Sequence, residues 1–327
     1  MSVLQTTENI KIPYPVEGVI RTAQLDDTVA PEDSVQLAVN MNFDRVGAIQ
    51  TRLGVTEYAT SLAENIKNFG SLKNSIIPAG YNQIFQIGSN NELADPFESA
   101  TAVKISDTKV AIFWQGTDSD GFCQNFEVDI LTGAMTPIGT PLEFDPVLAN
   151  DMFAIKVSAT IVLLAWAGTG NDGYVQCFNV SGDSIVALGT ALEYDTLNGR
   201  NPSLAQIDST HFICFYQGNG GNGNAVVFEV NLGTGAVTVP GATLTFTSST
   251  NYESGSTVSL QNGTHFSHFY YDTGGKARCF SVNTGTWAIT ALSTALAFDS
   301  AGLDNNLIYI DGTHVVNFFQ ASTGAFR

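Results

Sequence analysis

The residues best suited to chemistry form a short acidic segment, Thr117-Asp118-Ser119-Asp120-Gly121, between Trp114 and Cys123. Calcium takes roughly six to eight oxygen ligands, often from Asp-rich loops that contain glycine. Asp118 and Asp120 are therefore candidate calcium ligands. They could also form a catalytic acid pair, but no positioned nucleophile or base accompanies them. A third interpretation is a tight turn between two strands.

Glycine-rich segments similar to this one recur three times along the chain. They read GTGNDGY at 168–174, GNGGNGN at 218–224 and DTGGK at 272–276. The first segment contains two carboxylates, and the three later segments contain one, none and one, whereas Gly occurs in all four segments and Asn in two. Gly and Asn tolerate the positive φ that tight hairpins need. The comparison favours a turn and leaves calcium at Asp118 and Asp120 as the narrower hypothesis.

The histidines and cysteines invite metal or nucleophile hypotheses, but their spacing favours structural roles. Three histidines, His211, His265 and His314, each follow a Thr at one place in the repeat, and Lys109 takes that place earlier. Matching places in different units lie too far apart to share one ion. His268 is outside this register and has no visible partner. The four cysteines contain no CxxC pair, which predicts free buried thiols.

A repeat of about fifty residues organises most of the chain. A central Phe recurs at Phe126, Phe178, Phe228 and Phe280. A strand with two bulky residues and a glycine-rich turn precede each one. Every unit closes on a Leu-x-Phe or Leu-x-Tyr strand end, and turns recur every eight to twelve residues or so. Four short antiparallel strands in about fifty residues are typical of a β-propeller blade, so we predict an all-β propeller.

The number of blades follows from counting the units. The pair Phe318-Phe319 begins a fifth copy, and the segment GYNQIFQIG at 80–88 resembles GYVQCFNV at 173–180. This match makes Phe85 the fifth central Phe. We predict five blades, closed by pairing the segment near Phe85 with the strands around Phe319. The alternative is that these residues are a fragment of a longer chain with more blades.

Aromatic residues stand at matching places before the glycine-rich turns: Trp114, Trp166, Tyr216 and Tyr270. They could line sugar sites between blades. Their strands are apolar at successive positions, however, which is typical of strands buried on both faces. We therefore expect these four side chains in the core between blades. The sequence contains no phosphate-binding loop, GxSxG elbow, HExxH motif or dinucleotide fingerprint.

The composition of the chain limits which partners the protein can bind and in which compartment it is made. The 327 residues carry a net charge of −18, and charged residues make up only 13% of the chain. An acidic surface repels phosphate backbones and anionic lipids, so nucleic acid and membrane are not expected as partners. The N-terminus resembles no signal peptide, and no apolar run is long enough for a membrane helix. We expect synthesis in a cytoplasm without export by the general route.

Residues 1–70 do not fit the repeat, and we treat them as an arm before a propeller at 71–327. They contain Gly18-Val19, Pro31-Glu32-Asp33, Asn40, Phe43-Asp44-Arg45-Val46-Gly47 and Thr51-Arg52-Leu53-Gly54. This pattern resembles the N-terminal segment of tailed-bacteriophage virion proteins that carry a β-propeller. The family usually has Pro where this chain has Leu53.

The resemblance implies a structural protein of the tail or head-to-tail region of the virion, made in the cytoplasm of the host bacterium. The arm would bind other virion proteins through Asn40, Phe43, Asp44, Arg45 and Arg52, and the protein would form a homo-oligomer around the particle axis. An arm that merely packs under the propeller is the simpler alternative. We expect no enzymatic activity and no cofactor other than the calcium hypothesis. The alternative function is a carbohydrate-binding propeller that recognises a host-surface glycan, and a propeller glycosidase is a third.

Overall fold

The computed structural model describes residues 99–260 and 263–321, together with four short strands nearer the N-terminus. Those strands pair as two hairpins: β1 (Ile10–Lys11) with β2 (Thr22–Ala23), and β3 (Met41–Phe43) with β4 (Ile49–Thr51). The chain divides into two compact units, residues 1–86 and 87–327. The predicted boundary at residue 70 and the segment around Phe85 lie outside the described residues.

The second unit begins with two antiparallel sheets of four strands each. The first sheet contains β5 (Ala100–Lys104), β6 (Lys109–Gln115), β7 (Gly121–Val128) and β8 (Met135–Asp145). The second contains β9 (Asn150–Lys156), β10 (Ile161–Ala167), β11 (Gly173–Asn179) and β12 (Val186–Asp195), with a one-turn 3₁₀ helix, η3 (Thr169–Asn171), between β10 and β11. In both sheets consecutive strands are neighbours.

The third and fourth sheets follow the same plan, except that their outermost strand is split. The third contains β13 (Arg200–Gln206), β14 (His211–Gln217), η4 (Asn219–Gly221), β15 (Gly223–Val230), β16 (Val237–Thr238) and β17 (Leu244–Thr247). The fourth contains β18 (Glu253–Ser259), β19 (His265–Tyr271), β20 (Gly275–Asn283), β21 (Ala288–Ala291) and β22 (Leu296–Asp299). Pro240 lies in the break between β16 and β17, where its missing N–H could not serve the sheet.

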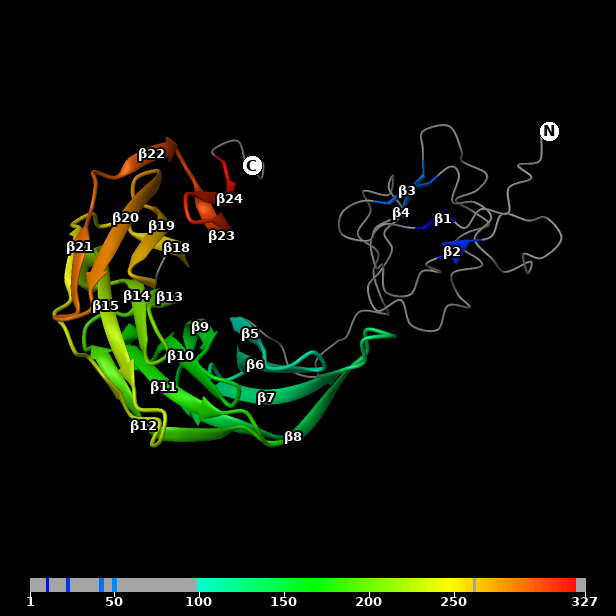
Figure 1. The fold of residues 1–327 in the computed structure, drawn as a ribbon. Coiled ribbons are helices and arrows are strands. Elements are labelled where there is room, and N and C mark those ends of the chain that lie inside the picture. The colour runs from blue at the N-terminus through cyan, green and yellow to red at the C-terminus, as the bar shows by residue number, and fades with distance from the viewer. Residues whose placement is uncertain are drawn as a thin grey trace. The chain divides into compact units, whose positions relative to one another are not determined.

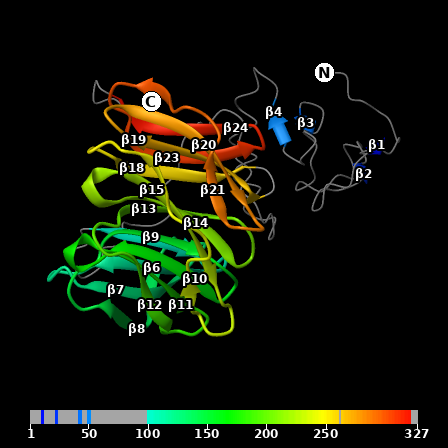
Figure 2. The ribbon, with the colours of Figure 1, turned by 90° about the vertical axis from the view of Figure 1, so that its left-hand side faces the viewer.

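A final hairpin, β23 (Leu303–Asp311) with β24 (His314–Gln320), repeats the two inner strands of a sheet. The sheets stand side by side in an arc, and the first strand of each contacts the first strand of the next (Figure 1). Figure 2 shows the same sheets stacked along the arc. The predicted β-propeller is confirmed, and the described residues form four complete blades and the first two strands of another. Closure of a five-bladed ring stays a prediction.

The core lies between neighbouring blades, because the second strand of each blade is buried on both faces. All seven residues of β10 are buried, including Trp166 at 1% exposure. The aromatic residue that ends one blade packs on aromatics of the next: the ring centroid of Phe144 is 5.3 Å from that of Trp166 and 5.7 Å from that of Phe178. Tyr194 repeats this contact with Tyr216 and Phe228. Trp166, Tyr216 and Tyr270 are buried in clusters between blades, as predicted, whereas Trp114 is buried in a cluster made only of first-blade residues.

A glycine opens the third strand of each blade because an aromatic ring of the fourth strand lies against it. A Cβ at Gly173 would come within 2.5 Å of the Tyr194 ring and 3.0 Å of the Cα of Gly199. The same relation joins Gly121 with Phe144, Gly223 with Phe246, and Gly275 with Phe298. The aromatic ring of the Leu-x-Phe/Tyr motif therefore packs against the glycine that opens the third strand of the same blade.

Candidate functional site

The acidic segment forms the turn between β6 and β7. The N–H of Gly116 donates to the Asp120 carbonyl at 2.8 Å, and the N–H of Ser119 donates to the Gly116 carbonyl at 3.1 Å. Ser119 has a φ of 70°, as Asn171 and Gly221 have φ of 67° and 81° at the same place in the next two blades. The turn prediction is confirmed in backbone detail.

Each of these turns also accepts a backbone hydrogen bond from the segment that leads into the next blade. The N–H of Ala149 donates to the Ser119 carbonyl at 3.0 Å, and Gly199 and Tyr252 make the equivalent bonds to Asn171 and Gly221. The side chain of Asp118 is exposed and that of Asp120 is partly buried. Among the described residues, no three His, Cys, Asp or Glu side chains are arranged to hold a metal ion. Calcium at Asp118 and Asp120 stays a prediction.

The histidines that open a second strand bind their own hairpin. The ring Nδ1 of His211 lies 2.9 Å from Asp208 Oδ1, and that oxygen also accepts the N–H groups of Thr210 and His211, each at 2.8 Å. Partial burial acts to raise the pKa of Asp208, but these hydrogen bonds outweigh it and lower the pKa. His314 and Asp311 repeat the arrangement at 2.9 Å. The predicted structural role therefore holds for His211 and His314, whereas the exposed His265 ring has, among the described residues, only the hydroxyl of the adjacent Thr264 as a hydrogen-bond partner, at 3.1 Å.

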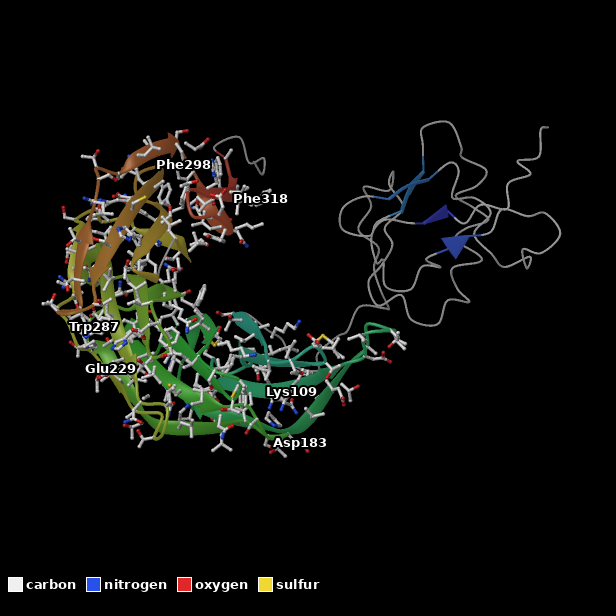
Figure 3. All side chains as sticks on the ribbon, in the orientation of Figure 1. Lys109, Asp183, Glu229, Trp287, Phe298 and Phe318 are labelled. Carbon is white, nitrogen blue, oxygen red and sulfur yellow. The ribbon has the colours of Figure 1, made fainter. Side chains whose placement is uncertain are left out.

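The same repeat position also joins neighbouring blades. Lys109 Nζ donates to the carbonyls of Val180 and Gly182, in the turn after the third strand of the next blade. The ring of His211 stacks on Trp287 of the next blade, with centroids 3.6 Å apart and planes at 17°. Figure 3 shows Lys109 near Asp183, and Trp287 near Glu229. Lys109 and His211 therefore each link their blade to the next one.

The sequence missed the partners of His268. Its ring is fully buried in β19, and Nε2 lies 2.9 Å from the Tyr252 hydroxyl while Nδ1 lies 2.8 Å from Thr257 Oγ1. Ser203 Oγ of the third blade donates to Thr257 Oγ1 at 3.0 Å. Burial lowers the pKa of His268 to about 3, against a small opposing effect of a hydrogen bond with the Ser256 backbone. His268 is thus a neutral core residue that links two blades, and the expectation that it lacks a partner was wrong.

The cysteines and turn-preceding aromatics offer little reactive surface. The four cysteines are free, and three of them, Cys123, Cys177 and Cys214, are buried, while Cys279 is partly exposed. Burial raises the pKa of the Cys177 thiol to about 12. Trp166 is enclosed, and its Nε1 donates to Asp145 Oδ2 of the preceding blade at 2.9 Å. None of these groups is positioned as an exposed nucleophile or as a stacking surface for a sugar.

The residues that the resemblance assigns to assembly cannot be placed by side chain. Asn40, Asp44, Arg45 and Arg52 lie outside the described residues, and only the backbone of Phe43 is described, as the last residue of β3.

A feature that the sequence did not reveal recurs at the start of the innermost strands. Asp151, Asn201 and Asp304 occupy one repeat position and have φ of 49°, 51° and 51°. Each lies where the pairing of the first two strands shifts register, which marks a β-bulge. Asp and Asn are the non-glycine residues that best tolerate this left-handed conformation. The sequence signal for these bulges was a polar residue, Asp or Asn, that recurs about fifty residues apart, as at Asp151 and Asn201.

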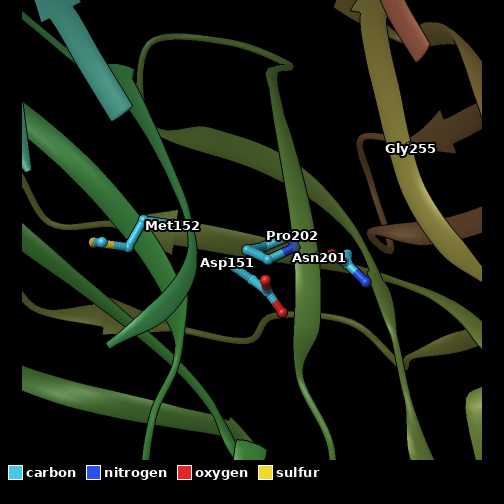
Figure 4. A pocket seen from close by; sticks show the side chains of 5 residues that line it. All are labelled: Asp151, Met152, Asn201, Pro202 and Gly255. Carbon is cyan, nitrogen blue, oxygen red and sulfur yellow. The ribbon is translucent and has the colours of Figure 1, made fainter. Parts of the chain in front are cut away.

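Two of these bulges and a third strand together line a pocket. Its walls are Asp151 and Met152 of β9, Asn201 and Pro202 of β13, and Gly255 of β18 (Figure 4), and its volume is about 150 Å³. Arg200 Nε donates to Asp151 Oδ2 at 3.0 Å and so joins the two bulges. A pocket that combines charged, amide and apolar walls can bind a small ligand, and this is the candidate functional site.

No helix among the described residues is long and apolar enough to cross a membrane. No family model matches the sequence, and no curated protein matches it.

Solved structures that resemble the chain share all-β folds at low identity. The periplasmic gluconolactonase PpgL of Pseudomonas aeruginosa is 12% identical with a TM-score of 0.49, over 67% of this chain and 68% of that one. The Aleuria aurantia lectin, a fungal six-bladed β-propeller with fucose recognition, is 11% identical with a TM-score of 0.45, over 71% and 73%. The NanB sialidase of Streptococcus pneumoniae is 8% identical with a TM-score of 0.46, over 61% and 32%. Because all three scores are below 0.5, the assignment of a propeller here rests on the strand order.

Proposed function

We propose that this protein is a non-enzymatic structural component of a bacteriophage virion, in the tail or head-to-tail region. Its N-terminal segment docks on other virion proteins, and its propeller is held outward as a rigid module. The proposal includes assembly of several copies around the particle axis and synthesis in the cytoplasm of the host bacterium. The N-terminal motif from Gly18 to Gly54 supports the virion setting.

One structural observation carries the non-enzymatic part of the proposal. Side chains whose types suit chemistry serve as links within and between blades: Lys109 on Val180 and Gly182, His211 on Trp287, and Trp166 on Asp145. A molecule that uses such groups for packing has the rigidity that a particle component needs. The strongly negative net charge of −18 also disfavours contact with nucleic acid or anionic lipid.

Incorporation into particles tests this proposal. Full-length wild-type protein and the variants Arg45→Ala and Arg52→Ala would be supplied to bacteria that produce particles lacking it. We expect wild-type protein in purified particles and a strong loss of incorporation for the two variants. Lys104→Ala is the matched control, because Lys104 is an exposed basic residue of the propeller with 70% of its side chain accessible. Equal incorporation of all variants would contradict docking through the N-terminal motif, and absence of the wild type would contradict the virion assignment.

Carbohydrate binding is the second candidate function, and the pocket between β9, β13 and β18 favours it. Asp151 and Asn201 bring a carboxylate and an amide to one small concave surface. Polar planar groups of this kind bind sugar hydroxyls through paired hydrogen bonds. A glycan array with the full-length protein tests this candidate. Binding to a defined set of host-surface glycans would support it, and an empty array would refute it.

A further inference from the structure

The pocket lined by Asp151, Met152, Asn201, Pro202 and Gly255 presents both hydrogen-bond donors and acceptors. Arg200 Nε occupies Asp151 Oδ2, while among the described residues no side chain or backbone group bonds to Asp151 Oδ1. The side-chain amide of Asn201 likewise has no hydrogen-bond partner within that part of the chain, so it offers two N–H donors and a carbonyl acceptor. The lining of the pocket therefore includes unused acceptors and donors.

The rest of the lining is apolar or bare backbone. Met152 and Pro202 are buried residues of the lining, and the Met152 side chain belongs to the hydrophobic core between the first two blades. Gly255 contributes backbone alone, because a Cβ there would lie 2.2 Å from Cε1 of the buried His268. Figure 4 shows Pro202 between Asp151 and Asn201, with the Met152 side chain directed away from them.

The charge of the site selects among ligand classes. Asp151 and Arg200 neutralise each other as a pair, with the Asp151 side chain only 23% exposed. An anion would meet the carboxylate of Asp151, and a bare cation at that carboxylate would lie close to the positive charge of Arg200. A neutral ligand with several hydroxyl groups avoids both conflicts, because a hydroxyl both donates and accepts. Its C–H groups would cover Pro202.

The volume limits how much of such a ligand can enter. Pockets for drug-sized ligands measure roughly 300–1,000 Å³, and this one measures about 150 Å³. We propose that the pocket binds one ring of a neutral sugar, with Asp151 accepting from its hydroxyls and Asn201 bonding a neighbouring hydroxyl. This inference rests on the second candidate function and is independent of the virion assignment.

The bulges supply a matched set of variants. Asp151, Asn201 and Asp304 share the left-handed backbone, but Asp304 is not part of the pocket. Glycine adopts positive φ without strain. Asp151→Gly, Asn201→Gly and Asp304→Gly therefore remove a side chain while each bulge keeps its backbone. Circular dichroism and thermal unfolding would verify that the three variants fold as the wild type does.

Saturation-transfer NMR with the full-length protein tests the inference, using the methyl glycosides of glucose, mannose, galactose and N-acetylglucosamine as probes. We expect at least one probe to bind with millimolar affinity, and Asp151→Gly and Asn201→Gly to weaken that binding about tenfold or more, since each removes a polar partner. Asp304→Gly should bind as the wild type does.

Two results would overturn the inference in different ways. Equal binding by all three variants would place the sugar elsewhere on the protein, so the pocket assignment would fail while carbohydrate binding stood. Absence of binding by every probe, together with an empty glycan array, would refute both. Neither result bears on incorporation into particles.

Discussion

Acid should destabilise the contact between the third and fourth blades through His268. The ring is fully buried, and its hydrogen-bond partners Tyr252 and Thr257 are neutral hydroxyls that suit an uncharged imidazole. Its flat faces pack against Phe215, with centroids 4.2 Å apart, and against Tyr270 at 5.3 Å. A proton on this ring would place an unbalanced charge in the core.

The magnitude follows from the pKa of His268. Burial lowers it from 6.5 to about 3 in the folded protein. Between these two pKa values the unfolded chain binds a proton at His268 and the folded protein does not. The contribution of His268 to the free energy of unfolding is therefore fully present above pH 6.5 and is lost as the pH falls towards 3. The full loss is about 5 kcal/mol. Between neutral pH and a pH of about 4.5, the loss is about 3 kcal/mol.

Urea unfolding of the full-length protein at these two pH values measures the effect. The three tryptophans, Trp114, Trp166 and Trp287, all lie in blades, so their fluorescence reports on the propeller. His268→Gln is the test variant, because glutamine keeps hydrogen-bonding groups but does not titrate. Other groups, such as Asp208, contribute to the pH dependence of both proteins and cancel in the comparison. We expect the wild type to lose about 3 kcal/mol more than the variant. The same pH dependence in both proteins would refute the assignment of His268 as a neutral buried group.

Three further predictions concern the blades. Gly173→Ala should lower the free energy of unfolding by about 1–3 kcal/mol, because the added methyl group collides with Tyr194. The control is Gly182→Ala, where the nearest atom to an added Cβ is 3.5 Å away, and it should change the free energy of unfolding by less than about 0.5 kcal/mol. Equal effects of the two substitutions would contradict the contact of Gly173 with the Tyr194 ring. Removal of the His211 ring should expose the stacked Trp287, so His211→Ala should shift tryptophan fluorescence to longer wavelength; the same emission as in the wild type would argue against the stacking. The turn at Asp118 and Asp120 is held by backbone hydrogen bonds, so a chelator should not change thermal unfolding; a calcium-dependent rise in melting temperature that Asp118→Asn removes would instead establish the calcium site.

The repeat made most of the architecture predictable from the sequence. Residues at matching places meet the same environment in each blade, so the spacing of Phe126, Phe178, Phe228 and Phe280 was enough to locate four sheets. The place of the histidines in that repeat also indicated their structural role. The split outer strands were not predicted, because a break within one strand leaves the fifty-residue interval unchanged.

The candidate site and the His268 network were harder to predict for a physical reason. Tyr252, Thr257 and His268 lie on different segments of the fourth blade, and only the folded pairing of β18 with β19 brings them together. The bulges at Asp151 and Asn201 depend on a register shift between two strands, which residue types alone do not specify.

Immunoelectron microscopy of intact particles tests the central claim most directly. Antibodies against the propeller would be applied to phage particles purified from bacteria that carry this gene. We predict labelling confined to the tail or the head-to-tail region, with several copies per particle. Particles that carry no label, together with recovery of the protein only as a free monomer in the lysate, would contradict the assignment of a structural virion component.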